Sequence, residues 1–332
     1  MKISHPYLLF LGDAADPLAA KTANGIARWR PEWCLGQLRL PGCAADVGLP
    51  DLDLDTAYGA GARSLIVGVA NRGGTIDDSW RPVLLAALQR GMDIASGLHV
   101  RLALDSEFAE YADKHGCTIF DVRYSEVKLS VGSSRRRRGK RLLTVGTDVS
   151  CGKMFTALAM ERELHQRGVP ADFRATGQTG ILIAGDGIAV DAVISDFIAG
   201  AAEWLTPDAD EDHWDLIEGQ GSLFHLSYAG VTLGLIHGSQ PDVLVLCHDP
   251  RRESMRGLPD LALPPLRECI ELNERCARRA NPDCRVIGLS LNTSTYNNND
   301  ARRLLTSIED ELGLPVVDAY REGAQRLVDA LG

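Results

Sequence analysis

The sequence lacks any Cys-x-x-Cys pair, although it contains eight cysteines. They are scattered along the chain, at positions 34, 43, 117, 151, 247, 269, 276 and 284. This scatter disfavours a zinc or iron–sulfur site. The chain also lacks a basic excess, since its net charge is −10. Nucleic acid is therefore disfavoured as the main partner, because a phosphate backbone requires a basic protein surface.

A membrane-spanning run and an export signal are also missing from the start of the chain. The apolar run at 7–11 is interrupted by Gly12 and Asp13, which makes it too short to span a bilayer. No small-residue cleavage site follows it. We therefore expect a cytoplasmic protein with no membrane partner.

The dinucleotide-binding fingerprint G-x-G-x-x-G is absent as well. The first strand-like run continues as "FLGDAADPLAAK" (10–21), which contains a single glycine. This argues against an NAD-dependent dehydrogenase.

What the sequence does contain is an alternation of strand-like and helix-like segments over 332 residues. This alternation predicts an α/β fold with parallel sheets, and the length allows two domains. Strands are expected at 7–12, 64–70, 119–122, 141–146, 171–176, 214–219, 242–248, 284–292 and 314–318. Helices are expected at 17–29, 81–91, 105–115, 153–168, 189–205, 265–280 and 300–312, with one more at the C-terminus. We predict a Rossmann-like N-terminal domain at 1–128, a basic linker at 129–140 and a second α/β domain at 141–332.

The segment "GTDVSCGKM" follows the strand expected at 141–146 and precedes a helix. Its two glycines permit a sharp turn, and the backbone N–H groups and the lysine can then surround an anion at the helix N-terminus. Five residues separate the glycines, one more than in the usual G-x-x-x-x-G-K-[ST] loop. We assign phosphate contacts to Gly146, Thr147, Asp148, Val149, Ser150, Cys151, Gly152, Lys153 and Met154.

This spacing resembles the phosphate loop of dethiobiotin synthetases. The resemblance implies that 141–332 is a P-loop NTPase-like domain built on a parallel sheet. In that family a Glu-Gly pair helps to hold the metal, and Glu218-Gly219 occupies a similar place in this sequence.

Met154 stands where phosphate loops usually carry the Ser or Thr that binds Mg²⁺. A thioether is a poor ligand for Mg²⁺, which prefers oxygen. Phosphate binding with no strict requirement for a metal is therefore favoured over phosphoryl transfer. Coenzyme A is such a ligand, because its chemistry takes place at the thioester and not at its phosphates.

Polar residues follow several other expected strands. Glu218 can equally be functional or structural. His225 and His248 outrank His237 as functional candidates, although a lone histidine near an apolar segment is more often structural than catalytic. Further polar candidates after strands are Arg72, Arg174, Gln178, Thr179 and Asn292. The run Arg135–Arg138 is either a solvated linker or a phosphate contact.

Several long motifs together resemble the DgcN family of D-glutamate N-acetyltransferases. They include "LGDAADPLAAKTANG", "RWRPEWCLGQLRLPGC", "GVANRGG", "ASGLH", "DFRATGQTGILIAG" and "DHWDLIEGQGSLFH", together with the phosphate loop. The resemblance covers nearly the whole chain. It implies transfer of the acetyl group of acetyl-CoA, as cosubstrate, to the α-amino group of D-glutamate. It also implies an N-acetyl-glutamate racemase as pathway partner, and we expect a homo-oligomer.

A general base is needed in such a reaction, because only the free amine is nucleophilic. We consider Glu218 and His225 first and Asp148 next. Arg72 and Arg174 are candidates for the substrate carboxylates, with Gln178, Thr179 and Asn292 as further substrate contacts. An ATP-dependent kinase or ligase of the dethiobiotin-synthetase type is the alternative, favoured by the loop spacing and disfavoured by Met154. A non-catalytic nucleotide sensor is a third interpretation.

Overall fold

The computed structural model describes residues 2–17, 19–69, 75–124, 127–133 and 135–332. Contacts divide the chain into two compact units, one made of 1–126 and 177–189 and the other of 127–176 and 190–332. Each unit contains a parallel sheet covered by helices, as the α/β prediction required. The domain boundaries proposed at 128 and 141 stay a prediction. No helix among the described residues is long and apolar enough to cross a membrane.

The N-terminal unit is built on a five-stranded parallel sheet in the order β2-β1-β3-β4-β5. Its apolar runs are buried on both faces, which is typical of strands covered by crossover helices. Its elements are β1 (Tyr7–Gly12), α1 (Lys21–Trp29), β2 (Cys34–Arg39), α2 (Leu54–Gly59), β3 (Ser64–Val67), α3 (Arg81–Gln89), β4 (Asp93–Ser96), α4 (Ser106–His115), β5 (Ile119–Asp121) and α6 (Gln178–Ala184).

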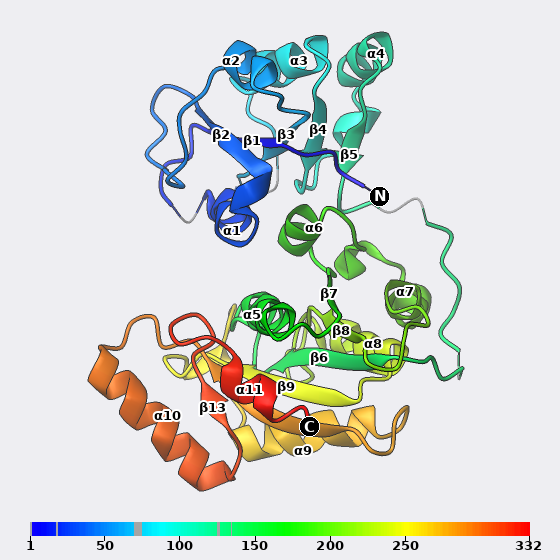
Figure 1. Cartoon of the computed structure of the whole chain (residues 1–332), viewed down its shortest axis with the longest axis vertical. Coiled ribbons are helices and arrows are strands. Elements are labelled where there is room, and N and C mark those ends of the chain that lie inside the picture. The colour runs from blue at the N-terminus through cyan, green and yellow to red at the C-terminus, as the bar shows by residue number, and fades with distance from the viewer. Residues whose placement is uncertain (1, 18, 70–74, 125–126, 134) are drawn as a thin grey trace. The chain divides into compact units, whose positions relative to one another are not determined.

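The C-terminal unit is built on a six-stranded parallel sheet in the order β13-β12-β9-β6-β8-β7. Figure 1 shows α5 and α9 on opposite faces of this sheet. Its elements are β6 (Lys140–Gly146), α5 (Lys153–Gln166), β7 (Ala171–Arg174), α7 (Ile198–Leu205), β8 (Trp214–Ile217), α8 (Ala229–Ser239), β9 (Val243–His248), β10 (Ser254–Met255), β11 (Leu258–Ala262), α9 (Leu266–Ala277), β12 (Arg285–Leu291), α10 (Asn298–Leu312), β13 (Val316–Val317) and α11 (Gln325–Asp329).

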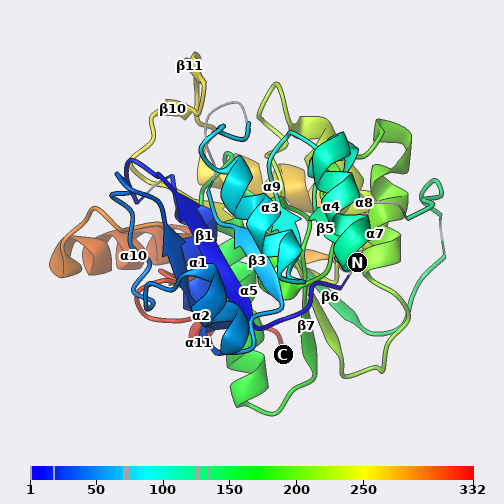
Figure 2. The same ribbon diagram turned by 90° about the horizontal axis from the view of Figure 1, so that it is seen from above.

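The order of the six strands determines where polar side chains gather. Because the strands are parallel, their carboxyl ends lie along one edge, where open α/β sheets bind ligands. Strand β6 ends at Gly146, next to the ends of β8 and β9. Glu218, which follows β8, and His248, the last residue of β9, therefore lie along the same edge as the phosphate loop. A short antiparallel hairpin, β10–β11, follows β9 and stands out at the top of Figure 2.

The helix expected at 189–205 is shorter than predicted. It starts at Ile198, and two separate 3₁₀ turns occupy 190–192 and 195–197. The prediction also missed β2, β4, the hairpin, and helices α2, α6 and α8. Helix α8 was missed because it contains three glycines, which have low helix propensity.

Close packing explains two of those glycines. A β-carbon on Gly238 would lie 2.0 Å from the backbone oxygen of Ala199, and one on Gly234 would lie 2.6 Å from Ile198 Cγ2. The glycines therefore permit α7 and α8 to approach closely, and tertiary packing overrides their low propensity.

The basic run at 135–138 is exposed to solvent except at Arg137, and it lies away from the phosphate site. It precedes β6 and therefore lies toward the opposite edge of the sheet from the loop. Arg137 is buried, and its guanidinium donates to the backbone oxygens of Gly238 and Ser239 and to the hydroxyl of Thr206. Arg135 pairs with Asp208 at 2.9 Å. Arg137 therefore holds the chain against the end of α8 and the residue that follows α7.

Candidate functional site

The loop at 147–152 has the form of an anion cradle. Gly152 has a φ of 110°, which directs the chain into α5, and Ser150 has a φ of 51°. The backbone N–H groups of 150–154 donate to no acceptor within the described part of the chain. These N–H groups lie at the N-terminus of helix α5. They therefore provide the donors that a phosphate group requires.

The side chain of Lys153 turns back across this cradle. Its ammonium donates to the backbone oxygen of Asp148 at 2.8 Å and lies 3.5 Å from Cys151 Sγ. Gly146 makes this position possible, because a β-carbon there would lie 2.8 Å from the ammonium nitrogen. The loop thus places the cation beside the free N–H groups.

The carboxylate of Asp148 is buried and fully engaged in the loop. One oxygen accepts from the Val149 N–H at 2.7 Å. The other accepts from Arg252 Nη1 at 2.6 Å and from the Arg256 N–H at 2.9 Å. These three bonds favour a structural role for Asp148, and we do not retain it as a candidate base.

Thr147 links the loop to the end of β9. Its hydroxyl lies 2.9 Å from Nδ1 of His248. Burial, assisted by the nearby charge of Arg252, lowers the pKa of His248 to about 4. The imidazole is therefore neutral near pH 7 and supports the loop without adding charge.

His225 is buried, and both of its ring nitrogens have partners. Nδ1 accepts from the Ser227 N–H at 3.2 Å, which leaves the proton on Nε2, and Nε2 donates to the Arg256 backbone oxygen at 3.1 Å. A base needs a free lone pair, and this imidazole has none to offer.

Glu218 lies directly after β8. One carboxylate oxygen accepts from the Thr176 N–H at 3.0 Å. The residue is buried, with 5% of its surface exposed. The next residue, Gly219, fits tightly between the loop lysine and β6, since a β-carbon there would lie 1.6 Å from the Thr144 oxygen and 3.0 Å from Lys153 Cδ. The backbone that follows Glu218 thus packs against the lysine of the cradle.

The residues predicted to contact the substrate belong to different units of the structure. Arg174 donates to Asp215 at 2.6 Å and to Asp172 at 3.0 Å, so these two carboxylates already occupy its guanidinium. We therefore do not retain it as a substrate contact. Arg72 lies outside the described residues.

Gln178 and Thr179 begin helix α6 and belong to the N-terminal unit. The hydroxyl of Thr179 lies 3.2 Å from that of Thr22, on helix α1. Their role as substrate contacts stays a prediction.

Asn292 borders a cavity of about 290 Å³ beside the phosphate loop. The cavity is lined by the loop, the first turn of α5, the end of β12 and the segments that follow β12 and β13. The rings of Phe155 and Tyr320, which both line it, lie 5.9 Å apart and are inclined by 60°. The amide oxygen of Asn292 accepts from the Ser294 N–H at 3.2 Å. Aromatic and amide groups next to a phosphate cradle suit the base of a nucleotide.

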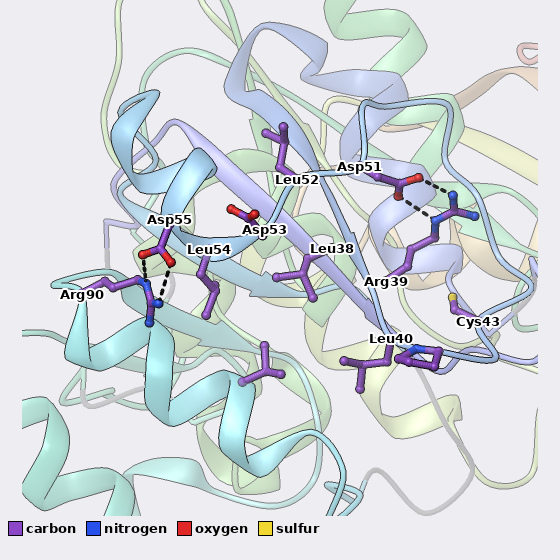
Figure 3. A pocket seen from close by; sticks show the side chains of 12 residues that line it. Leu38, Arg39, Leu40, Cys43, Asp51, Leu52, Asp53, Leu54, Asp55 and Arg90 are labelled. Carbon is purple, nitrogen blue, oxygen red and sulfur yellow. Dashed lines mark hydrogen bonds and ion pairs between the residues drawn. The ribbon is translucent and has the colours of Figure 1, made fainter.

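A second cavity, of about 810 Å³, lies in the N-terminal unit between β2, α2 and α3. Figure 3 shows its leucine side chains and two ion pairs. Arg39 pairs with Asp51, and Arg90 pairs with Asp55 at 2.7 Å. Because both arginines are already neutralised, this cavity offers no cation for a phosphate or a carboxylate. None of the predicted site residues lines it.

Residues 128–328 match the P-loop domain of the DUF1611 family, a domain of unknown function, and 39–125 match its Rossmann-like N-terminal domain. The chain belongs to the DUF1611 family.

Relatives of this DUF1611 protein extend over its full length. It is 56% identical over 99% of both chains to a protein from Tritonibacter scottomollicae named D-glutamate N-acetyltransferase. A protein of the same name from Pseudoalteromonas sp. is 46% identical, again over 99% of both chains. A crystal structure of a DUF1611 family protein from Anabaena variabilis is 33% identical over 99% of each chain, with a TM-score of 0.85. The resemblance to D-glutamate N-acetyltransferases and the two-domain α/β fold are thereby confirmed.

Arg252 is the residue of this DUF1611 site that the sequence did not reveal. It lies in "HDPRRES", directly after β9, and contacts three groups of the phosphate loop. A run of charged residues after the carboxyl end of a buried strand was the available signal, because that edge carries the loop. The distance of about 100 residues between Arg252 and Asp148 hid the pairing.

Proposed function

We propose that this protein is an N-acetyltransferase that moves the acetyl group of acetyl-CoA to the α-amino group of D-glutamate. The observation that carries the proposal is the 56% identity, over 99% of both chains, to a protein named D-glutamate N-acetyltransferase. The site supports a donor of the coenzyme A type, because it combines a phosphate cradle with a methionine that is a poor ligand for Mg²⁺.

The donor's pyrophosphate would be held by the N–H groups of 150–154 and by the ammonium of Lys153. The adenine would occupy the 290 Å³ cavity, between the aromatic rings and the amide of Asn292. In this arrangement the phosphates are a handle, and the reacting thioester lies at the other end of the molecule.

Acetyl transfer requires the removal of a proton from the substrate ammonium. The neutral nitrogen then attacks the thioester carbon, so that a C–N bond forms and the C–S bond breaks. The CoA thiolate leaves and takes up the second proton of the nitrogen. We propose Glu218 as the base, because it directly follows β8 at the sheet edge that carries the phosphate loop and precedes Gly219, whose backbone packs against Lys153.

The test of this assignment compares Glu218→Gln with His225→Gln. We expect Glu218→Gln to lower kcat by roughly 10²–10⁴-fold, the usual contribution of a positioned base, with little change in the KM for acetyl-CoA. The effect of His225→Gln should appear mainly in thermal stability. A Glu218→Gln enzyme with wild-type kcat would overturn the assignment of the base, although not the acetyl transfer itself.

The ATP-dependent alternative keeps one observation in its favour, the five-residue spacing between Gly146 and Gly152. Incubation with MgATP and a set of dicarboxylates distinguishes the ATP-dependent enzyme from the acetyltransferase. Release of inorganic phosphate would favour the kinase or ligase, whereas release of free thiol from acetyl-CoA would favour the transferase.

A further inference from the structure

Arg252 clasps the outer side of the phosphate loop. Its Nη1 donates to Asp148 Oδ2 at 2.6 Å and to the Val149 backbone oxygen at 2.5 Å, and its Nη2 donates to the Ser150 backbone oxygen at 2.9 Å. The guanidinium thus binds three consecutive residues of the loop. Its Nε lies 3.3 Å from Asp249 Oδ2, which fixes the other side of the group.

A phosphate loop needs such a clasp for a geometric reason. When successive N–H groups turn toward an anion, the carbonyl groups between them turn away and need donors of their own. Arg252 supplies these donors for Val149 and Ser150. Ser150 is also a non-glycine residue with a φ of 51°, a conformation that persists only where the surroundings hold it.

Charge gives a second reason. Asp148 is 1% exposed and lies in the very loop that would receive a doubly charged phosphate group. Its other partners are two neutral backbone N–H groups, those of Val149 and Arg256. An unbalanced carboxylate there would repel the ligand, since charges interact strongly in a poorly solvated site.

No other cation takes this place among the described residues. The Lys153 ammonium bonds to the backbone oxygen of Asp148 and not to its carboxylate. Nε2 of His225 lies 4.0 Å from Asp148 Oδ1, but its proton goes to the Arg256 backbone oxygen. The balancing charge is therefore that of Arg252.

We propose that Arg252 is a positioning residue for the phosphates of the donor. It holds the carbonyl groups of Val149 and Ser150 outward and neutralises Asp148, so that the inner side of the loop is left with unopposed N–H groups. Arg252 does not itself contact the ligand, because its donors are used within the protein. The proposal rests on the use of this loop as a pyrophosphate site.

The experiment measures the binding of inorganic pyrophosphate and of CoA by calorimetry, with KM and kcat for acetyl-CoA in parallel. The variants are Arg252→Gln, Arg252→Lys, Asp148→Asn and the double variant Arg252→Gln/Asp148→Asn. Arg251→Gln is the matched control, because it removes the same charge at the neighbouring position. The side chain of Arg251 bonds to Asp249 and to no residue of the loop. Thermal denaturation checks that each variant is folded.

We expect Arg252→Gln to weaken pyrophosphate and CoA binding about tenfold to hundredfold, the scale of a misplaced binding group. KM for acetyl-CoA should rise by a similar factor, while kcat changes by less. Arg252→Lys should restore part of the affinity through its charge. The double variant should bind both ligands more tightly than Arg252→Gln, because it carries no unbalanced carboxylate.

Several results would overturn the proposal. One is wild-type affinity for both ligands in a folded Arg252→Gln protein, and another is an equal loss in Arg251→Gln. A double variant no better than Arg252→Gln would remove the role of charge balance. Failure of the wild-type protein to bind either ligand would overturn the anion site altogether. If pyrophosphate binding depends on Arg252 as described but no acetyl group is transferred, the inference stands and the proposed function falls.

Discussion

The ammonium nitrogen of Lys153 lies 2.8 Å from the backbone oxygen of Asp148, inside the loop that the two residues share. The lysine side chain therefore spans its own phosphate cradle, and Lys153 is only 7% exposed. A phosphate oxygen that replaces this carbonyl partner would form a charge-assisted bond, which is stronger than a bond to a neutral carbonyl.

Replacement of Lys153 by alanine should weaken acetyl-CoA binding roughly tenfold to hundredfold, the loss expected for one hydrogen bond to a charged group. The measurement is the dissociation constant of CoA, with KM for acetyl-CoA as a second readout. Lys140→Ala is the control, because Lys140 starts β6 at the other end of the strand and stacks on Trp214. Equal affinities in wild type and Lys153→Ala would contradict the cradle.

The presence of Met154 predicts that donor binding does not depend on a divalent metal. CoA affinity should be the same with Mg²⁺ and with a chelator, because no hydroxyl is available at this position to bind the ion. Met154→Thr should gain affinity for ADP in the presence of Mg²⁺, whereas Met154→Leu should not. A tight, Mg²⁺-dependent binding of ADP by the wild-type protein would argue for the kinase or ligase.

Two glycines of helix α8 should respond in opposite ways to alanine. Gly238→Ala should lower the free energy of unfolding by about 3 kcal/mol, because the added methyl would clash with the Ala199 backbone oxygen. Gly230→Ala, in the same helix, meets no atom within 4 Å and should stabilise by up to about 1 kcal/mol through helix propensity. Chemical denaturation of both variants provides the comparison, and a similar response would refute the close helix contact.

His248 should make stability depend on pH in the acidic range. Its folded-state pKa of about 4 lies below the ordinary value of 6.5, so the unfolded chain binds the proton more readily. The resulting loss in the free energy of unfolding is absent above pH 6.5 and grows as the pH falls toward 4. It reaches at most about 3 kcal/mol.

Denaturation of wild type and of His248→Asn between pH 7 and pH 4 tests this prediction. The variant lacks the titrating ring, and its free energy of unfolding should fall less steeply with pH. Parallel curves for the two proteins would show that the histidine is not buried in its neutral form.

The strands around the phosphate loop could be predicted because their apolar runs are long and end in glycine or polar residues. The prediction placed β6, β9 and β12 within one residue of their observed ends. Strands β2 and β4 were missed because "CLGQLR" and "DIAS" carry too few apolar residues to stand out. Helix α8 was missed because its glycines serve a contact with α7 that only the fold reveals.

In the candidate site, too, local features could be predicted and contacts between distant residues could not. The loop could be predicted because a phosphate cradle is a local structure whose glycines and lysine are adjacent in the chain. The partners of Asp148, His225 and Arg174 could not, because each depends on residues brought together by the sheet. Side chains that look catalytic in sequence proved to be bonded to the protein itself.

The release of free thiol from acetyl-CoA, measured with D-glutamate as acceptor, tests the central claim most directly. L-glutamate, D-aspartate and D-glutamine serve as comparison acceptors, and inorganic phosphate is followed in parallel reactions with MgATP. We expect thiol release and N-acetyl-D-glutamate with D-glutamate, a clear preference over the other acceptors, and no phosphate release. Equal thiol release with all acceptors, or none with any of them, would contradict the proposed function.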